Sequence, residues 1–408
     1  MVITGIGCVS PNGIGRSAYC AACIEGRSGL KRLEGEAFTG LRTPAVGRID
    51  DFAVESVLDA QDARRLPRTV PLALAAAREA MEQAGLDVAD LEMSRRAGLV
   101  LGTGGGGLAF VEAQYRSWFT EGKGSLFAIT GGTHGNLAGE LSIALGLRGP
   151  SHVVSTGCAS STDALGYGML LIQAGRADTV VAGGADAPIA PGILRGFERM
   201  GVISTRPEDD PAHASRPFDV QRRGFILGEG AWMFVLERDE IAAARGARPL
   251  AHLAGYGSTC DAYHRVQIAP DVAECLRAME LALADAGAVP ADVDGVNLHG
   301  TGTEMNDRLE TLAMRRLLGA RANEVPMSAT KSLIGHPQGA GGAAGLAAAI
   351  LAARKGWIHP TVNLLDPDPE CDLDYVPNAA RRCEQRLILC NCIAFGSKNS
   401  ALAVRIEP

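Results

Sequence analysis

The chain has 408 residues, of which 47% are hydrophobic and 21% charged, and its formal net charge is −7 at pH 7. This length exceeds what one compact domain usually needs, so we expect two domains or one duplicated unit with a sizeable core. The composition argues against a disordered chain, and the negative charge argues against a general nucleic-acid binder.

The first residues, MVITGIGCVSPNGIG, read as a short strand followed by a glycine turn. They lack the charged start and the long apolar core of a signal peptide. The most apolar later stretch, residues 339–353, is too short and too rich in glycine to span a bilayer. We therefore expect a cytoplasmic protein with no membrane partner.

Strand-like and helix-like segments alternate in the first half. Strands are expected at 97–104, 152–156 and 178–186, and helices at 135–147 and 160–175. The apolar runs lack polar alternation, which suits strands covered on both faces, and the intervening helices suit parallel connections. This pattern is typical of an α/β fold.

The second half repeats the arrangement, with a strand entering a polar loop at 293–303 and a strand, loop and Gly/Ala-rich helix at 325–356. Residues 156–180 and 330–358 both pass from a Thr-led turn into a small-residue helix that ends in a glycine near a basic residue. This likeness indicates an internal duplication. We predict an N-terminal half at residues 1–247 and a C-terminal half at 248–408.

Cys158 stands in HVVSTGCASSTDALGYG, where a strand runs into a helix. The unpaired N–H groups and the dipole of a helix N-terminus favour a thiolate, so we expect a lowered pKa for this thiol. Gly157 and Ala159 leave room for a substrate to approach the sulfur. The sequence therefore predicts that Cys158 is a nucleophile.

The other nine cysteines are interpreted mainly as reduced, small core residues. The spacings of Cys20 with Cys23 and of Cys390 with Cys392 match no common zinc site, and we expect no metal.

Two histidines stand on glycine-flanked loops after predicted strands: His299 in NLHGTGT and His336 in KSLIGHPQGAGG. Such loops are where α/β sheets build active sites. We predict that both side chains move protons or stabilise an oxyanion beside the cysteine.

The segments VSTGCASS, LHGTGT, SATKSLIGH and CNCIAFGSKNSAL, in this order, resemble the β-ketoacyl-acyl carrier protein synthases. More narrowly, they resemble the elongating ketosynthases of dissociated bacterial fatty acid and polyketide systems. The likeness extends over nearly the whole chain, including RPFDVQRRGFILGEGA, DAYH and PTVNLLDPDPECDLDYVP. It implies a duplicated thiolase fold with five α/β/α/β/α layers and mixed sheets.

The resemblance implies an acyltransferase, a 3-oxoacyl-[acyl-carrier-protein] synthase, that binds no cofactor and takes substrates from the phosphopantetheine arm of acyl carrier protein. An acyl group would be held on the cysteine, and a malonyl group would lose carbon dioxide and attack it in a decarboxylative Claisen condensation. The family usually forms homodimers.

Carried over by position, the resemblance makes Cys158 the acyl acceptor and His299 and His336 the pair that acts on the malonyl group. Lys331 matches the family's active-site lysine, which is expected to fix and tune the surroundings of His336. Glu310 matches an acidic residue that is expected to pair with that lysine.

Phe395 matches a gating phenylalanine beside the nucleophile, and its N–H and that of Cys158 would form the oxyanion hole. Thr301 and Thr303 match positions that hydrogen-bond the phosphopantetheine arm. Arg64, Arg65 and Arg68 match a docking region for the acidic carrier protein, with Arg206, Arg222 and Arg223 as weaker candidates.

Four departures from the family pattern point to a specialised type II polyketide or polyene pathway. They are Lys398 in GSKN beside the gate, RVQIAP after DAYH, Gly345 in place of a glutamate of a cation site, and Gly105 at the acyl pocket, where it would leave more room.

Three other readings stay open. One is a thiolase, which uses a second cysteine near the C-terminus, where Cys390 and Cys392 stand. Another is a ketosynthase subunit that pairs with a chain-length partner in a heterodimer. An oxidoreductase is suggested only by the glycine run GTGGGG at 102–107, a weak signal because no acidic residue stands at the right distance.

Overall fold

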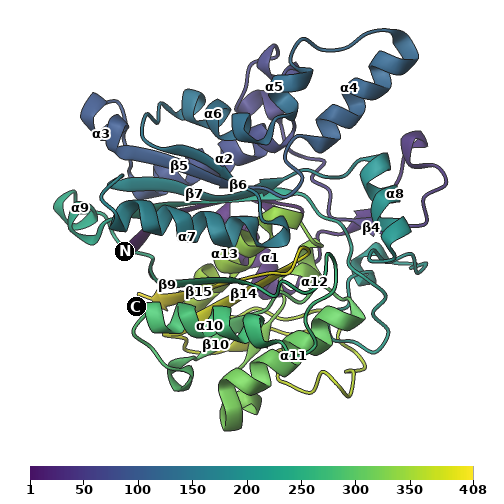
Figure 1. Cartoon of the computed structure of the whole chain (residues 1–408), viewed down its shortest axis with the longest axis vertical. Coiled ribbons are helices and arrows are strands. Elements are labelled where there is room, and N and C mark those ends of the chain that lie inside the picture. The colour runs from purple at the N-terminus through teal and green to yellow at the C-terminus, as the bar shows by residue number, and fades with distance from the viewer. Residues whose placement is uncertain (408) are drawn as a thin grey trace.

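The computed structural model describes residues 1–407, and its helices and sheets form five layers (Figure 1). Two sheets enclose a central layer of helices, and further helices cover the outer face of each sheet. The central helices are α1 (Arg16–Glu25), α7 (Ser160–Gln173) and α13 (Gly341–Ala353). The outer helices are α2 (Thr69–Ala84) and α6 (His134–Leu145) on one side, and α10 (Ala273–Asp285) and α11 (Glu304–Leu318) on the other. This α/β/α/β/α arrangement confirms the predicted fold class.

The two sheets have the same strand order and the same directions, as a duplication requires. The first runs β6-β5-β7-β8-β1 and the second β11-β10-β14-β15-β9, each parallel in its first three strands and antiparallel in the rest. The strands of the first are β1 (Val2–Ser10), β5 (Ala97–Gly102), β6 (Ser151–Val154), β7 (Thr179–Asp186) and β8 (Gly230–Glu237). Those of the second are β9 (Ala251–Cys260), β10 (Gly295–Asn297), β11 (Met327–Ser328), β14 (Leu387–Ala394) and β15 (Lys398–Ile406). Hydrogen bonds between β1 and β9 join the two sheets.

The remaining elements lie mainly at the edges of these layers. They are α3 (Leu91–Arg96), α4 (Leu108–Glu121), α5 (Ala128–Gly132), α8 (Pro191–Met200), α9 (Asp239–Ala244), α12 (Lys331–Ile334), and the short strands β2 (Gly13–Ile14), β3 (Lys31–Arg32), β4 (Ala45–Val46), β12 (Trp357–Ile358) and β13 (Arg381–Arg382). The predicted boundary between residues 247 and 248 falls in the connection from α9 to β9. The division into two domains stays a prediction. Within residues 1–407, no helix is both long enough and apolar enough to cross a membrane.

The strand predicted at 152–156 is β6, but the expectation that both its faces are covered is wrong. Ser151 and His152 are exposed, and Val153 and Val154 are only half-buried. The physical reason is its place at the edge of the sheet, where it pairs with β5 alone. An apolar run of this length does not distinguish an edge strand from a central one.

Small residues bring the layers close together. Helix α13 is buried on nearly all sides, because it lies between two sheets and carries only glycine, alanine, leucine and isoleucine. On the outer side of the first sheet, Gly7 of β1 packs against the backbone of α2, and a Cβ atom there would overlap the carbonyl oxygen of Ala76. Close backbone packing therefore explains part of the high glycine content.

Replacing Gly7 with alanine should lower the free energy of unfolding by about 3 kcal/mol, because the backbone of α2 has to move away from β1. Gly196→Ala is the matched control, since Gly196 lies in α8 with open space around it. The control should raise stability by about 0.5–1 kcal/mol through the higher helix propensity of alanine. Urea denaturation measures both changes, and equal effects of the two substitutions would refute the packing argument.

Candidate active site

The chain places Cys158 at a tight turn between β6 and α7. Residues Gly157–Ala159 form a single turn of 3₁₀ helix that leads directly into α7. Gly157 has φ +65°, a left-handed conformation that favours glycine. The Ser160 hydroxyl accepts a hydrogen bond from the backbone N–H of Thr156 at 2.9 Å, which fixes the turn. Cys158 is 5% exposed.

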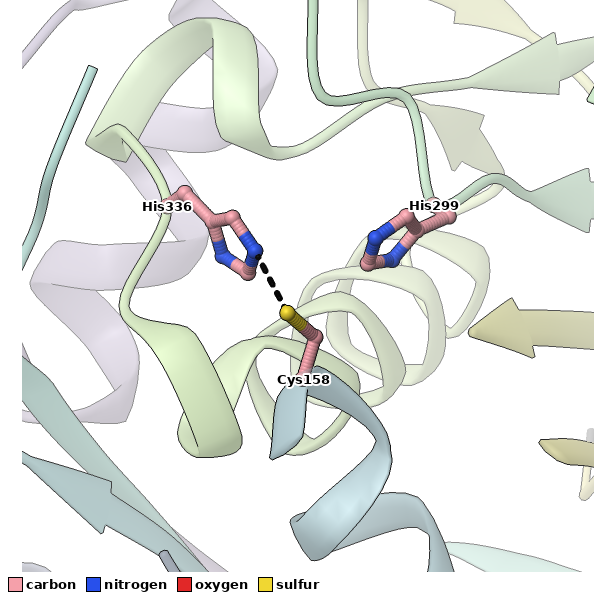
Figure 2. A group of neighbouring side chains, drawn as sticks. All are labelled: Cys158, His299 and His336. Carbon is pink, nitrogen blue, oxygen red and sulfur yellow. Dashed lines mark hydrogen bonds between the residues drawn. The ribbon is translucent and has the colours of Figure 1, made fainter. Parts of the chain in front are cut away.

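The structure brings Cys158, His299 and His336 together, as the sequence predicted (Figure 2). His336, on the loop between α12 and α13, has its Nε2 atom 3.1 Å from the sulfur of Cys158. His299, on the loop after β10, has its ring centroid 5.5 Å from that of His336, with the two rings nearly perpendicular. One potential ligand atom from each residue lies within 4.8 Å of the others, so this cluster could also hold a soft divalent metal.

Burial decides the protonation of all three groups. It raises the pKa of the Cys158 thiol to about 11, although the charge of Lys331 and the backbone N–H of Phe395 act in the opposite direction. The expected lowering of this pKa is therefore wrong, because enclosure of the sulfur outweighs the helix terminus. Burial also holds the pKa of His299 and of His336 well below the ordinary value, with the charge of Lys331 as the second cause. At neutral pH a neutral thiol faces two neutral imidazoles.

Lys331 contacts His299 rather than His336, and its charge lowers the pKa of His336, which agrees with the predicted tuning of that residue's surroundings. Its ammonium group donates a hydrogen bond to the backbone carbonyl of His299 at 2.6 Å and lies 3.4 Å from Nδ1 of the same residue. The reason is that Gly335 ends α12 between Lys331 and His336, so that the side chain of His336 is directed to the sulfur. Because an ammonium group only donates hydrogen bonds, Nδ1 of His299 accepts, and the ring carries its proton on Nε2.

Glu310 does not pair with Lys331, and within residues 1–407 Lys331 has no carboxylate partner within 4.0 Å. The Glu310 carboxylate instead accepts hydrogen bonds from the backbone N–H of His299 at 2.7 Å and of Gly300 at 2.8 Å. It also accepts from the side-chain amide of Asn391 at 2.8 Å. Glu310 therefore fixes the loop that carries His299.

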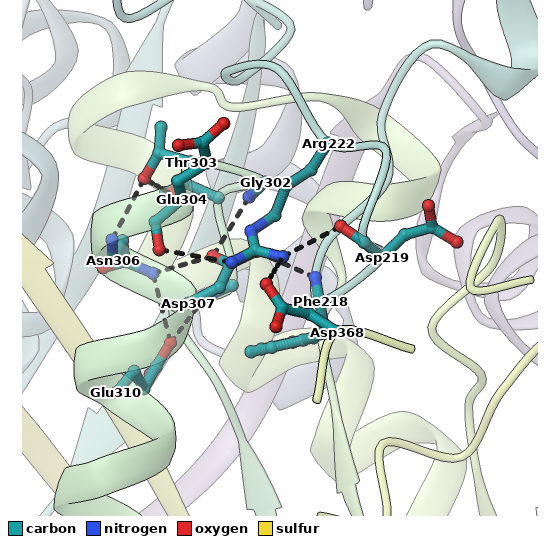
Figure 3. Close-up of polar contacts among 12 residues, drawn as sticks. Phe218, Asp219, Arg222, Gly302, Thr303, Glu304, Asn306, Asp307, Glu310 and Asp368 are labelled. Carbon is teal, nitrogen blue, oxygen red and sulfur yellow. Dashed lines mark hydrogen bonds and ion pairs between the residues drawn. The ribbon is translucent and has the colours of Figure 1, made fainter. Parts of the chain in front are cut away.

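A buried polar network continues from Glu310 (Figure 3). The Asn306 amide bridges Glu310 and Asp307, and Asp307 accepts hydrogen bonds from the N–H groups of Phe218 and Gly302. Arg222, 3% exposed, lies 3.6 Å from Asp307 and 2.7 Å from Asp368. The sequence analysis missed the role of Asp307, although its spacing of three residues from Glu310 places both carboxylates on one face of α11.

A cavity of about 420 Å³ opens onto the sulfur of Cys158. The lining includes both histidines, Thr301, Thr303, Phe395 and, nearer the rim, Arg223 and residues 266–268 of RVQIAP. The Thr301 and Thr303 hydroxyls lie 3.0 Å apart. The backbone N–H groups of Phe395 and Cys158 act on the sulfur to lower its pKa, against the larger effect of burial.

Gly105 does not line this cavity. Its N–H donates a hydrogen bond to the carboxylate of Asp186 at 2.9 Å, and Asp186 also accepts from the N–H of Gly104 and of Gly339. Gly339 follows His336 closely in the chain, so Asp186 fixes the loop of the second histidine. The place of Gly105 at the acyl pocket stays a prediction, and its loop folds around this buried carboxylate.

The three arginines predicted to dock a carrier protein differ in their surroundings. Arg68 pairs with the buried carboxylate of Glu229 at 2.8 Å, so its guanidinium has a structural partner. Arg65 lies 3.7 Å from Asp62 and stacks 4.9 Å above the ring of Phe127. Arg64 is exposed. The docking role of the three stays a prediction, and none of them lines the cavity.

Two of the departures, GSKN and Gly345, place their altered residues outside the lining of the cavity. The hydroxyl of Ser397, in GSKN, donates a hydrogen bond to the carbonyl of His264, in DAYH, at 2.8 Å and joins these two loops. Lys398 begins β15 and is half-buried. Gly345 faces the amide of Asn297, which hydrogen-bonds to Thr330 at 2.9 Å.

A second cysteine, Cys392, also contacts the site. Its sulfur lies 3.1 Å from the carbonyl oxygen of Cys158 and 3.4 Å from Nδ1 of His299. Burial raises the pKa of this thiol to about 12, so that it stays protonated. The sequence analysis did not place Cys392 beside His299, because this contact depends on the pairing of β14 with β10.

Comparisons with known proteins match the whole chain. The N-terminal domain model of the β-ketoacyl synthases matches residues 1–242, and the C-terminal domain model matches residues 250–365. The chain is 40% identical over 416 residues to the tetracenomycin polyketide synthase ketoacyl synthase alpha subunit of Streptomyces glaucescens, covering 100% of this chain and 97% of the relative. It is 37% identical over 407 residues to 3-oxoacyl-[acyl-carrier-protein] synthase 2 of Synechocystis sp., covering 99% and 97%.

Among solved structures, a type II polyketide synthase acyl-carrier protein in complex with its ketosynthase, bound to the hexaketide, matches with a TM-score of 0.90. The sequence identity is 31%, and the match covers 100% of this chain and 99% of that one.

Alkylation of Cys158 by iodoacetamide should accelerate about tenfold per pH unit between pH 7 and 10, because the thiolate fraction rises until the pH reaches the pKa of about 11. Mass-spectrometric peptide mapping follows Cys158 separately, and Cys260→Ser removes the exposed cysteine. A rate that levels off near pH 7 would show that Cys158 is already a thiolate in the free protein. It would contradict the neutral thiol and neutral imidazole described for Cys158 and His336.

Proposed function

The chain belongs to the β-ketoacyl synthase family, and we propose that it condenses a malonyl group, carried on acyl carrier protein, with an acyl group held on Cys158. The observation that carries this proposal is the meeting of one thiol and two neutral imidazoles beneath a single cavity. It agrees with the function that the sequence motifs implied.

In the first half-reaction, the thiol of Cys158 attacks the acyl thioester. Nε2 of His336, 3.1 Å away, takes the proton, and the same proton then passes to the departing thiol of the carrier arm. The N–H groups of Phe395 and Cys158 stabilise the oxyanion of the tetrahedral intermediate. The Cys158 thiol and the His336 imidazole are both neutral before the transfer, so their contact adds no net charge to the buried site.

In the second half-reaction, the malonyl carboxylate leaves as carbon dioxide, and its electron pair forms an enolate at the thioester. Nε2–H of His299 donates to the enolate oxygen, and neutral His336 is the second donor once its proton lies on Nε2. The enolate carbon attacks the acyl carbon, the bond from that carbon to Cys158 breaks, and the thiolate takes up a proton from solvent. Loss of carbon dioxide makes this step irreversible.

The chain offers a face for a second subunit of the same fold. Large apolar side chains are exposed on α4, α6 and the segment around α5, among them Phe119, Leu126 and Ile143. The edge strand β6 follows α6 directly. We propose that this face binds a second copy of the chain or a related chain-length subunit. A solved ketosynthase/chain-length-factor structure, 33% identical with a TM-score of 0.91, supports a chain-length subunit as the partner.

The reactions of a fatty acid pathway and of a type II polyketide pathway need the same site. The 40% identical relative belongs to a polyketide synthase, which supports the specialised polyketide or polyene role proposed for this chain. Loading by ordinary saturated fatty acyl carriers at least as fast as by unsaturated or polyketide ones would count against that role.

Intact-mass measurement tests the chemistry directly. Cys158→Ala should gain no acyl mass from acyl carrier protein, because no other thiol faces the cavity. His299→Ala should acylate normally but lose malonyl decarboxylation by about 10²–10³-fold, since one oxyanion donor is gone. Release of carbon dioxide separates this reaction from that of a thiolase. An acyl-enzyme on Cys158→Ala would overturn the proposal.

Lys331→Met should shift the acid limb of the decarboxylation rate to higher pH. The charge of Lys331 lowers the pKa of both histidines, so removing it raises both pKa values. The histidines then become protonated at a higher pH, and the protonated rings are inactive because the reaction uses neutral imidazoles. A pH–rate profile measures the shift. Lys355→Met, an exposed lysine, is the control and should leave the limb in place. A shift to lower pH would contradict this electrostatic role.

A further inference from the structure

The rim of the active-site cavity carries one exposed arginine, Arg223. Its side chain is 54% exposed and lines the cavity together with Thr303 and Cys158. It also lines a shallower depression next to the cavity, which Arg42 and Arg206 share. Arg223 therefore stands where the cavity meets the outer surface.

Two neighbouring arginines, Arg206 and Arg222, pair with carboxylates. Arg223 donates hydrogen bonds from Nη1 to the backbone carbonyls of Arg222 at 2.7 Å and Val220 at 3.4 Å, which leaves its Nε and Nη2 without a protein partner within residues 1–407. Arg222 is buried and lies between the carboxylates of Asp307 and Asp368. Arg206 pairs with Glu208 at 3.3 Å and hydrogen-bonds to Gln221 at 3.0 Å. Arg223 has one acidic partner, Glu304, at 3.5 Å.

The pair of Arg223 with Glu304 is easily exchanged. Glu304 is 74% exposed, so water screens the attraction, and surface pairs of this kind stabilise a protein little. A phosphate offers an arginine two parallel hydrogen bonds and a full negative charge. An anion arriving at the rim would therefore displace Glu304 from the guanidinium.

We propose that Arg223 binds the phosphate of the phosphopantetheine arm and thereby selects carrier-bound substrates over thioesters that lack phosphate. The inference rests on the proposed function, because that function brings the arm into this cavity. The arm carries its thiol at one end and its phosphate at the other. When the thioester lies against Cys158 and the middle of the arm passes Thr301 and Thr303, the phosphate remains toward the rim.

Three acyl thioesters of increasing size test the proposal: acyl-pantetheine without phosphate, acyl-phosphopantetheine, and the acyl carrier protein. Intact mass follows the second-order rate constant for acylation of Cys158. Arg223→Gln should lower this constant about tenfold for the two phosphate-bearing substrates and leave acyl-pantetheine within about twofold. Glu304→Gln should raise it about twofold for the same two substrates, since the competing carboxylate is gone.

Arg42→Gln is the matched control, because it removes one positive charge from the adjoining depression without lining the cavity. It should leave all three constants unchanged. The inference is overturned by an equal loss with all three thioesters, by a loss confined to the carrier protein, by no loss at all, or by the same loss in Arg42→Gln. If no thioester acylates the unaltered chain, the proposed function itself fails.

Discussion

The contact between the thiol of Cys158 and the imidazole of His336 depends on the burial of both groups between the two sheets. Burial keeps the thiol and the imidazole neutral, so the proton can move between them over 3.1 Å without the cost of desolvating separate charges. The residues reach one another because α7 and α13 lie in the same central layer, each behind a tight turn of small residues. A nucleophile that relied on a pre-formed thiolate would need a more exposed or more positively charged site.

Two buried carboxylates hold the loops that present the histidines. Glu310 accepts hydrogen bonds from the backbone of the His299 loop, and Asp186 accepts from that of the His336 loop. Burial raises the pKa of both carboxyl groups, and the backbone N–H donors oppose that rise. Backbone N–H groups are suitable partners here, because they stabilise each buried carboxylate by hydrogen bonds without placing a further charge beside the imidazoles.

Lys331, a buried cation beside both histidines, acts without a carboxylate of its own within residues 1–407. A carboxylate at Lys331 would cancel the field that keeps His299 and His336 neutral. By contacting Nδ1 of His299, the ammonium group also fixes which ring nitrogen faces the cavity. Different groups therefore perform two tasks. The carboxylates fix the positions of the two loops through backbone N–H groups, and Lys331 controls the protonation of the two histidines.

The sequence by itself determined the α/β class, the duplication and the identity of Cys158, His299 and His336, because glycine-flanked turns after apolar strands are local patterns. Lys331 was identified only through its match to a family motif. The sequence could not determine the partners of Lys331 and Glu310, which both contact the loop after β10 from segments distant in the chain. It also misjudged the Cys158 pKa, since a helix start is visible in sequence and enclosure by two sheets is not. The tertiary structure decided these points because burial and charge pairing arise from segments far apart in the chain, such as Cys392 beside His299.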